Sequence, residues 1–254
     1  MAWANTGKYR NKNPEAQNIN VEYERSAVRA ASDIGCRVFV GAGSQAEYGP
    51  KDLPLIGPDT PAEPTEYYGI AKLAAMKEGL KEARMSGISF IWMRIFSTYG
   101  PFDKATSMIS ESIVKMLKGE PAEFTPATQI WDYLYSEDAA RAFYLAGERG
   151  KKEAVYCLGS GKGRPLKEYI QIMTEAVDPS IVPGIGKKPF PPGKVRNLNA
   201  DIESLKRDTS FCPAVPFEEG IARTVAYFRE ALKEEEIYKG VPADEKNIDR
   251  NTYL

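Results

Sequence analysis

Short apolar runs alternate with helical patterns of hydrophobic and polar positions along most of this chain. The runs at residues 37–40 and 88–96 lack polar alternation, which is typical of strands buried on both faces of a sheet, and residues 154–158 predict another short strand. A further strand is expected at residues 131–135. Apolar positions three and four residues apart predict helices at residues 21–34, 66–85, 108–117, 138–146, 165–177 and 217–232. Strands that alternate with helices predict an α/β fold with a parallel sheet.

Polar and proline-rich stretches separate the predicted elements. Residues 49–64 contain five prolines and residues 182–195 contain four, so both are expected to be loops. The first twenty or so residues are polar and predict no strand. The stretch at 236–254 is predicted to be a charged tail.

The overall charge is close to neutral, with 34 Lys and Arg against 35 Asp and Glu. Neither sign dominates, so no nucleic-acid partner and no membrane-surface partner are expected. The longest apolar run, at residues 88–96, is too short to span a bilayer, and the opening residues lack the apolar core of a signal peptide. A cytoplasmic location is therefore expected.

The absence of histidine narrows the possible chemistry, because it removes His-based triads and most zinc or non-haem iron sites. No metal site is expected. The cysteines, Cys36, Cys157 and Cys212, are far apart and are interpreted as buried thiols in a reducing compartment. If the protein is an enzyme, its general acid–base catalysis must use Tyr, Lys, Asp or Glu.

Ser44, Tyr68 and Lys72 form the candidate catalytic group. Tyr68 and Lys72 are four residues apart in a predicted helix, which puts them on one face, one turn apart. A nearby ammonium favours the phenolate form of a tyrosine, so Lys72 could lower the pKa of Tyr68 into a working range. Each signal alone is weak, since a Y-x-x-x-K pair arises by chance and a serine after a strand is usually a turn residue. The order of strand, Ser-containing turn, Pro-rich loop, Y-x-x-x-K helix and strand strengthens the interpretation.

In this arrangement the chain resembles the NAD-dependent epimerase/dehydratase branch of the extended short-chain dehydrogenase/reductase superfamily. The resemblance runs from Met1 to about Arg229. The matching segments are residues 41–49, in which Ser44 stands four residues before Tyr48-Gly49, then Tyr68-Gly-Ile-Ala-Lys72, Arg94-Ile-Phe-Ser-Thr-Tyr-Gly-Pro101, Trp131-Asp-Tyr-Leu-Tyr-Ser-Glu-Asp138, Asp201-Ile-Glu-Ser with Phe217-Glu-Glu-Gly220, and Asn20-Val21.

The resemblance implies a nucleotide-sugar epimerase, dehydratase or reductase that transfers a hydride between a sugar carbon and NAD or NADP. It implies that Tyr68 is the general base, that Lys72 lowers its pKa and holds the nicotinamide ribose, and that Ser44 binds the reacting oxygen. The implied cofactor-binding residues are Ala2, Trp3, Tyr68, Lys72 and Ile95, and the implied substrate-binding residues are Ser44, Gln45, Ser97 and Arg196. The substrate would be a nucleoside-diphosphate sugar.

Two positions depart from the family pattern. Trp131 replaces an arginine that contacts the substrate diphosphate in several relatives, and Ser97 stands where many relatives have asparagine. Arg196 could supply the missing charge, although a solvated loop arginine is an equally good interpretation. The glycine-rich residues 159–163 fit neither the dinucleotide motif nor the Walker pattern, and are interpreted as a tight turn.

The family's opening strand and G-x-x-G-x-x-G turn are not found in this sequence. We therefore expect a truncated NAD(P)-binding Rossmann-like parallel sheet with a smaller C-terminal α+β substrate domain. Residues 1–101, with 131–158, are assigned to the partial Rossmann domain, and 102–130 with 159–235 to the substrate domain.

Alternatives stay open at this point. A cofactor-less fragment that binds a nucleotide sugar or a partner chain is the second hypothesis, and a product without a stable fold is the third. The sequence does not separate NAD from NADP, because the deciding residue belongs to the segment not found. A homodimer through the helices at 21–34 and 66–85 is also expected, since both carry more apolar positions than one sheet face requires.

Overall fold

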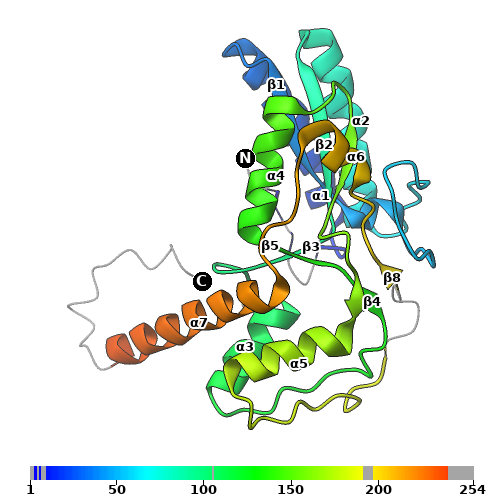
Figure 1. Cartoon of the computed structure of the whole chain (residues 1–254). Helices are drawn as coiled ribbons and strands as arrows, with labels where there is room; N and C mark the ends of the chain where they lie inside the picture. Colours follow the sequence, from blue (N-terminus) through cyan, green and yellow to red (C-terminus); the bar gives the residue numbers. More distant parts are fainter. Residues whose placement is uncertain (1–2, 5, 7–9, 105, 191–196, 240–254) are drawn as a thin grey trace.

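A three-stranded parallel sheet is the centre of one half of the protein (Figure 1). Its strands lie in the order β1 (Val38–Ser44), β2 (Ser89–Ile95) and β6 (Val155–Leu158). Ser44 pairs with Ile95 and Ile95 with Leu158, so the carboxyl ends of the strands meet at one edge. This computed structural model describes residues 3–4, 6, 10–104, 106–190 and 197–239, with side chains up to Lys233. The predicted α/β class is confirmed.

Helices cover both faces of the sheet, as the alternating side chains of β2 show. Phe90 and Trp92 pack with α1 (Pro14–Asp33) and α2 (Tyr67–Ser86). Ile91 and Met93 pack with α4 and α6 on the other face. The bounds of these two helices are Ser136–Arg149 and Glu203–Thr209. β2 is therefore buried on both faces, as its continuous apolar sequence predicted.

Helix α1 begins at Pro14, seven residues before the predicted start. Asn13 caps it by accepting a hydrogen bond from the backbone N–H of Ala16, and Pro14 occupies the first turn. Its first two turns escaped the hydrophobic pattern because their buried residues, Gln17 and Asn20, are polar. The polar opening therefore contains the start of a helix.

Two predicted strands have different bounds in the structure. β1 continues past residue 40, where the predicted strand ends, through Gly41 and Gly43 to Ser44. The expected strand at 131–135 is divided at Asp132 into β4 (Ile130–Trp131) and β5 (Tyr133–Tyr135). The buried Asp132 carboxylate accepts backbone hydrogen bonds from three residues, which breaks the regular strand.

The other half of the protein lies below the sheet in Figure 1 and is mainly helical. Its core joins α3 (Met108–Leu117), α5 (Leu166–Val177) and α7 (Phe217–Lys239). α7 continues past residue 236, where the charged tail was expected to begin, because no Gly or Pro interrupts it before residue 240. The short strands β3, β7 and β8, at Ser97–Tyr99, Arg164–Pro165 and Asn197–Leu198, join β5 or β4 in two small sheets. The division into the two predicted domains stays a prediction.

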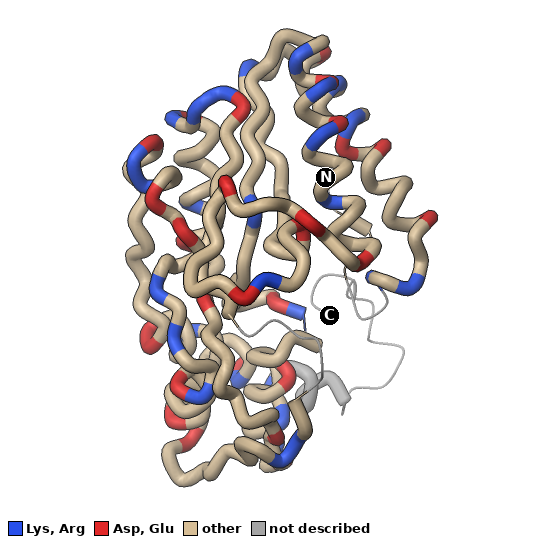
Figure 2. The backbone as a smooth tube through the Cα atoms, turned by 90° about the vertical axis from the view of Figure 1, so that its right-hand side faces the viewer, with Lys and Arg blue, Asp and Glu red and all other residues tan. Residues whose placement is uncertain are grey.

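Several predicted burial positions are wrong. Cys36 and Cys212 are exposed, and only Cys157 is buried. The helix pattern at 66–85 also predicted that Ile70 would be buried, but it is 46% exposed, because Gly69, Ala71 and Lys72 take the inward positions of α2. Lys, Arg, Asp and Glu are interspersed over both halves of the backbone in Figure 2. No helix in the described part of the chain is long and apolar enough to cross a membrane.

Candidate active site

Ser44 lies at the carboxyl end of β1, where the strand turns into the short 3-10 helix η1 (Gln45–Tyr48). Its side-chain oxygen accepts a hydrogen bond from the backbone N–H of Ala46 at 3.2 Å and so caps this helix. The backbone N–H of Ser44 donates to the Glu47 carboxylate at 2.8 Å, which completes a capping box. Ser44 is therefore held by hydrogen bonds at both its backbone and its side chain.

A buried ion pair lies beneath this turn. Glu47 is fully buried, and its Oε2 atom accepts from Nε of Arg94 at 2.8 Å. Its Oε1 atom accepts from Nε1 of Trp92 at 2.9 Å as well as from Ser44. Because these donors come from β1 and β2, the carboxylate ties the Ser44 turn to the middle of the sheet.

Gly69 brings the start of α2 against the Ser44 turn. A Cβ atom at Gly69 would lie 2.3 Å from the carbonyl oxygen of Ala46, so only glycine permits this approach. The preceding residue, Tyr68, therefore lies beside Ser44, and Lys72 follows one turn later on the same helix face. The structure brings the three predicted catalytic residues together at the carboxyl edge of the sheet.

Lys72 is buried and its ammonium group has two contacts. Nζ donates to the carbonyl oxygen of Ala42 at 2.7 Å and lies 3.6 Å from the centre of the Trp3 ring. Burial lowers the pKa of Lys72 to about 8, while the negative charges of Glu24 and Glu47 oppose that change. The lysine still carries its proton at neutral pH.

Tyr68 lies between aromatic and cationic neighbours. The Arg10 guanidinium lies 4.8 Å from its ring centre, and the Trp3 ring meets it edge-on at 6.3 Å. Burial raises the pKa of Tyr68; a hydrogen bond with Ser44 and the charge of Arg10 lower it. The structure thus adds Arg10 to the cations near Tyr68, a residue that the sequence analysis missed because no motif includes it.

The remaining predicted residues fall in different places. Ile95 is the last residue of β2 and Ser97 the first of β3; both are half-buried, as is Gln45 beside Ser44. Ser97 accepts a hydrogen bond from Nε1 of Trp131 at 2.9 Å, so the two departures from the family pattern contact each other. Ala2 and Arg196 lie outside the described residues.

The glycine-rich turn after β6 is bound to a carboxylate of the chain itself. The backbone N–H groups of Ser160 and Gly161 donate to Asp132 at 2.7 and 3.0 Å. These two amides are occupied, so they do not form a free cradle for a phosphate. The interpretation as a structural turn agrees with this geometry.

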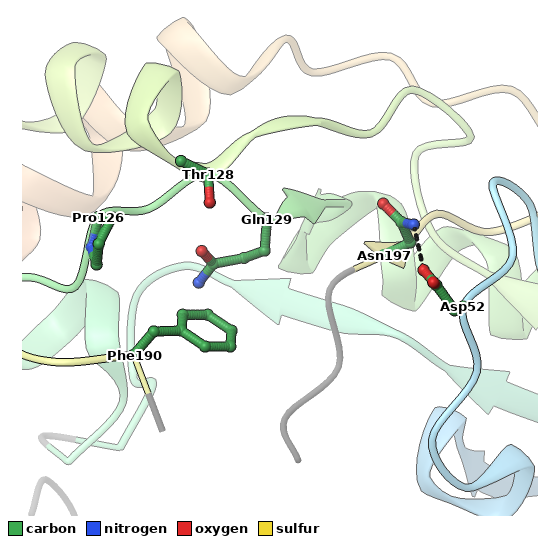
Figure 3. Close-up of a pocket in the computed structure, with 6 residues that line it drawn as sticks. All are labelled: Asp52, Pro126, Thr128, Gln129, Phe190 and Asn197. Carbon is green, nitrogen blue, oxygen red and sulfur yellow. Dashed lines mark hydrogen bonds between the residues drawn. The ribbon is translucent and has the colours of Figure 1, made fainter. Parts of the chain in front are cut away.

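A cavity of about 350 Å³ opens between the proline-rich loop after η1 and the helical half (Figure 3). Asn197 donates to Asp52 at its rim at 3.1 Å. The Gln129 Oε1 atom is buried and has no hydrogen-bond partner among the described residues. Ala127, two residues before this glutamine, has a strained backbone with a positive φ of 54°. The lining residues are Asp52, Pro126, Thr128, Gln129, Phe190 and Asn197.

The sequence profile of the NAD dependent epimerase/dehydratase family matches residues 2–159, which include Ser44, Tyr68 and Lys72. The chain belongs to this family. This family member is 24% identical over 212 residues to the dTDP-glucose 4,6-dehydratase of Streptomyces griseus, covering 82% of this chain and 64% of that protein. It is 27% identical over 186 residues to dTDP-glucose 4,6-dehydratase 1 of Escherichia coli, covering 70% of this chain and 51% of that protein.

Solved structures of the epimerase/dehydratase type share the fold. The UDP-glucose 4-epimerase of Thermotoga maritima with UDP-glucose superposes with a TM-score of 0.81 at 24% identity, covering 91% of this chain and 76% of that one. MoeE5 in complex with UDP-glucose and NAD gives a TM-score of 0.76 at 29% identity, covering 86% of this chain and 74% of that one. RMD from Pseudomonas aeruginosa, complexed with NADPH, gives 0.80 at 19% identity, covering 91% and 80%.

The donor groups of this family member fit one end of a dinucleotide cofactor. The phenol of Tyr68 and the ammonium of Lys72 lie one helix turn apart, and both groups can form hydrogen bonds with hydroxyl groups such as those of a nicotinamide ribose. The amides of Ser160 and Gly161 are occupied by Asp132, so this glycine-rich turn offers nothing to a pyrophosphate.

Proposed function

We propose that this chain carries the alcohol–ketone half of an NAD(P)-dependent redox site that acts on a nucleotide sugar. The observation that carries the proposal is the approach of Tyr68 to Ser44 across Gly69, with the buried Lys72 one turn further along. Together, this hydroxyl, phenol and ammonium can bind a substrate hydroxyl group, remove its proton and return it.

Each residue has a separate task in this proposal. NAD or NADP, when bound, accepts and returns the hydride. Ser44 donates a hydrogen bond to the sugar oxygen and orients it. As the alcohol becomes a ketone, the Tyr68 phenolate takes the proton from that oxygen, and the phenol gives it back on reduction. The charge of Arg10 stabilises the phenolate, which burial alone disfavours, and the Lys72 ammonium, 5.9 Å from the Tyr68 ring centre, is proposed to add to this effect.

We favour epimerase or reductase chemistry over dehydration. Loss of water from a sugar needs one group to remove a proton from carbon and another to protonate the leaving hydroxyl. The residues that follow Ser44 are Gln45 and Ala46, which do neither. The next residue, Glu47, is fully buried in its ion pair with Arg94, so its carboxylate is not free to exchange a proton with a substrate.

The cavity in Figure 3 is proposed to hold the nucleotide part of the substrate. Its polar groups, on Thr128, Gln129 and Asn197, and the Phe190 ring can contact a base through hydrogen bonds and stacking. The UDP-glucose complexes of the two structural relatives named above support a nucleoside-diphosphate sugar as the substrate class.

Binding of the nucleotide sugar without cofactor is the second candidate function. Two groups of hydrogen-bond donors that a cofactor could use already have partners within the chain. Lys72 contacts Ala42 and Trp3, and the 159–161 amides bind Asp132. Calorimetric titration with UDP-glucose and, separately, with NADH distinguishes the two candidates. Binding of UDP-glucose alone supports the second one.

The redox proposal is tested by Tyr68→Phe, with Tyr67→Phe as the matched control. Tyr67 is the preceding residue of α2 and is 48% exposed. We expect Tyr68→Phe to reduce turnover of UDP-sugars with NAD(P) by at least about 100-fold while UDP-glucose binding persists. The control should keep full turnover. Equal turnover in the two variants would refute the assignment of Tyr68.

We also propose that the chain forms a homodimer through α1 and α2, which pack side by side. Ile19 and Tyr23 on α1 and Ile70 on α2 are each about half exposed. Exposed apolar side chains grouped on neighbouring helices favour self-association. Tyr23→Glu is expected to shift the mass by light scattering from dimer to monomer, whereas Tyr144→Glu on α4 should leave it unchanged. A monomeric parent chain at micromolar concentration would contradict the proposal.

A further inference from the structure

A buried carboxylate without a hydrogen-bond partner lies close to the site, on helix α1. Glu24 is only 5% exposed, and its Oε1 atom has no partner among the described residues. Burying a charge in this way costs free energy unless a nearby opposite charge compensates. The position therefore needs an explanation beyond packing.

Two glycines make room for this side chain. A Cβ atom at Gly41 of β1 would lie 2.9 Å from the Oε1 atom of Glu24, and one at Gly79 of α2 would lie 3.6 Å from its Cγ atom. The carboxylate is thus seated against the middle of β1 at Gly41. The next residue of that strand, Ala42, is the one whose carbonyl oxygen accepts the ammonium of Lys72.

Lys72 is the cation that compensates this carboxylate. The charge of Lys72 lowers the pKa of Glu24, and the charge of Glu24 raises that of Lys72; burial acts in the opposite direction on both and is the larger effect. The other ionisable groups around the lysine are Glu47 of η1 and Tyr68, whose ring centre is 5.9 Å from Nζ. Since Glu47 is already paired with Arg94, Glu24 is the carboxylate whose charge is left for the lysine.

We propose that Glu24 is a positioning residue that keeps the Lys72 ammonium charged and anchored on the Ala42 carbonyl. The inference rests on the proposed function, because the charge of Lys72 matters there through its effect on Tyr68. Glu24 itself touches neither Ser44 nor a substrate. It acts through the lysine, from helix α1, which packs with α2 on the same face of the sheet.

The direct test is an NMR titration of the Lys72 side chain in the full chain labelled with ¹³C and ¹⁵N lysine. The Lys72 signal is assigned from its loss in Lys72→Arg. In Glu24→Gln we expect the acid dissociation constant of Lys72 to rise about tenfold, because an opposite charge has been removed. Glu24→Asp should restore much of the parent value. Glu22→Gln, an exposed position on the same helix, should leave Lys72 unchanged.

An unchanged Lys72 titration in folded Glu24→Gln would overturn the proposal. If that variant does not fold, the reciprocal measurement decides, because coupling between two sites acts equally in both directions. The titration of Glu24 in Lys72→Met must then move to higher pH, and an unmoved titration would equally overturn the proposal.

Turnover measurements separate this inference from the proposed function. In an active chain, the alkaline limb of kcat/KM against pH should move to lower pH in Glu24→Gln but not in Glu22→Gln. The lysine titration needs no turnover. A shifted titration in a chain that does not oxidise or reduce any nucleotide sugar would therefore uphold the Glu24–Lys72 coupling and refute only the redox function.

Discussion

The sheet half and the helical half of this protein are stabilised by different kinds of buried contact. Around the sheet, Glu24, Glu47, Lys72 and Arg94 are all at most 5% exposed. The core between α3, α5 and α7 contains aromatic rings instead, and its buried hydroxyls, such as that of Thr174, bind carbonyl oxygens of their own helix.

The difference follows from what each half is proposed to do. Burying a charge costs desolvation free energy, and it is tolerated where a second charge or a hydrogen-bond network compensates that cost. These four side chains lie behind or beside Ser44 and Tyr68. The helical half is proposed to form part of the wall of the cavity in Figure 3. That role requires a fixed shape, which aromatic and aliphatic packing provides.

The largest expected effect comes from breaking the buried ion pair. Arg94→Met leaves the fully buried Glu47 without its cation, and we expect the free energy of unfolding to fall by about 3–5 kcal/mol. Urea unfolding measures the change. The double variant Glu47→Gln with Arg94→Met should recover part of the loss, since no unpaired charge remains. A single-variant loss below about 1 kcal/mol would remove the contrast between the two halves.

A substitution that creates a cavity in the helical half tests the other side of the comparison. Phe217 is buried, with its ring 4.9 Å from Tyr99 and 4.6 Å from Tyr169 between ring centres. Phe217→Ala should reduce the free energy of unfolding by about 3–4 kcal/mol in urea, through lost burial and an unfilled cavity. Phe102→Ala, at a ring that is 68% exposed, is the matched control and should change it by less than half as much. Equal losses would show that the aromatic cluster is not the stabilising core.

The next largest effect is a pH dependence of stability that arises from a buried carboxylate of the sheet half. Burial raises the pKa of Glu24 from 4.5 to about 6, with the charge of Lys72 opposing. Between these pH values the folded state binds more protons than the unfolded state, so this group's contribution to stability is present below pH 4.5 and is lost as the pH rises through 6. The loss is about 2 kcal/mol.

Urea unfolding of the parent chain and of Glu24→Gln across this pH range measures that contribution as a difference. We expect the difference to grow between the two pKa values and then to level off. Glu22→Gln should follow the parent chain. Parallel curves for the parent chain and Glu24→Gln would mean that Glu24 is not held in a buried, charged state.

The smallest expected effects concern close packing on β1. A Cβ atom at Gly41 would lie 2.4 Å from Cε3 of Trp92, so Gly41→Ala should cost about 1–3 kcal/mol in urea unfolding. Gly147 lies within α4, where a Cβ atom would lie 3.7 Å from its nearest neighbour, Cγ2 of Val40. Gly147→Ala should instead stabilise the chain by about 0.5–1 kcal/mol, because alanine favours the helix. Stabilisation at both positions would show that Trp92 can move.

Hydrophobic patterning by itself determined the class of fold and most of the elements. The helix at Met108–Leu117 has the bounds that its apolar positions predicted, because three of its side chains follow one regular stripe into the core. The pairing of Tyr68 and Lys72 on one face was equally readable, since helical geometry alone sets it. Local periodicity is enough for such features.

Only the tertiary structure decided the surroundings of the site. Arg10 lies over Tyr68, Glu24 lies behind Lys72, and Trp131 contacts Ser97, although the members of each pair are far apart in the chain. The start of α1 was also hidden, because its buried Gln17 and Asn20 bind the opening segment through polar groups. Long-range electrostatics and polar burial leave no period in a sequence, because they depend on which strands and helices become neighbours.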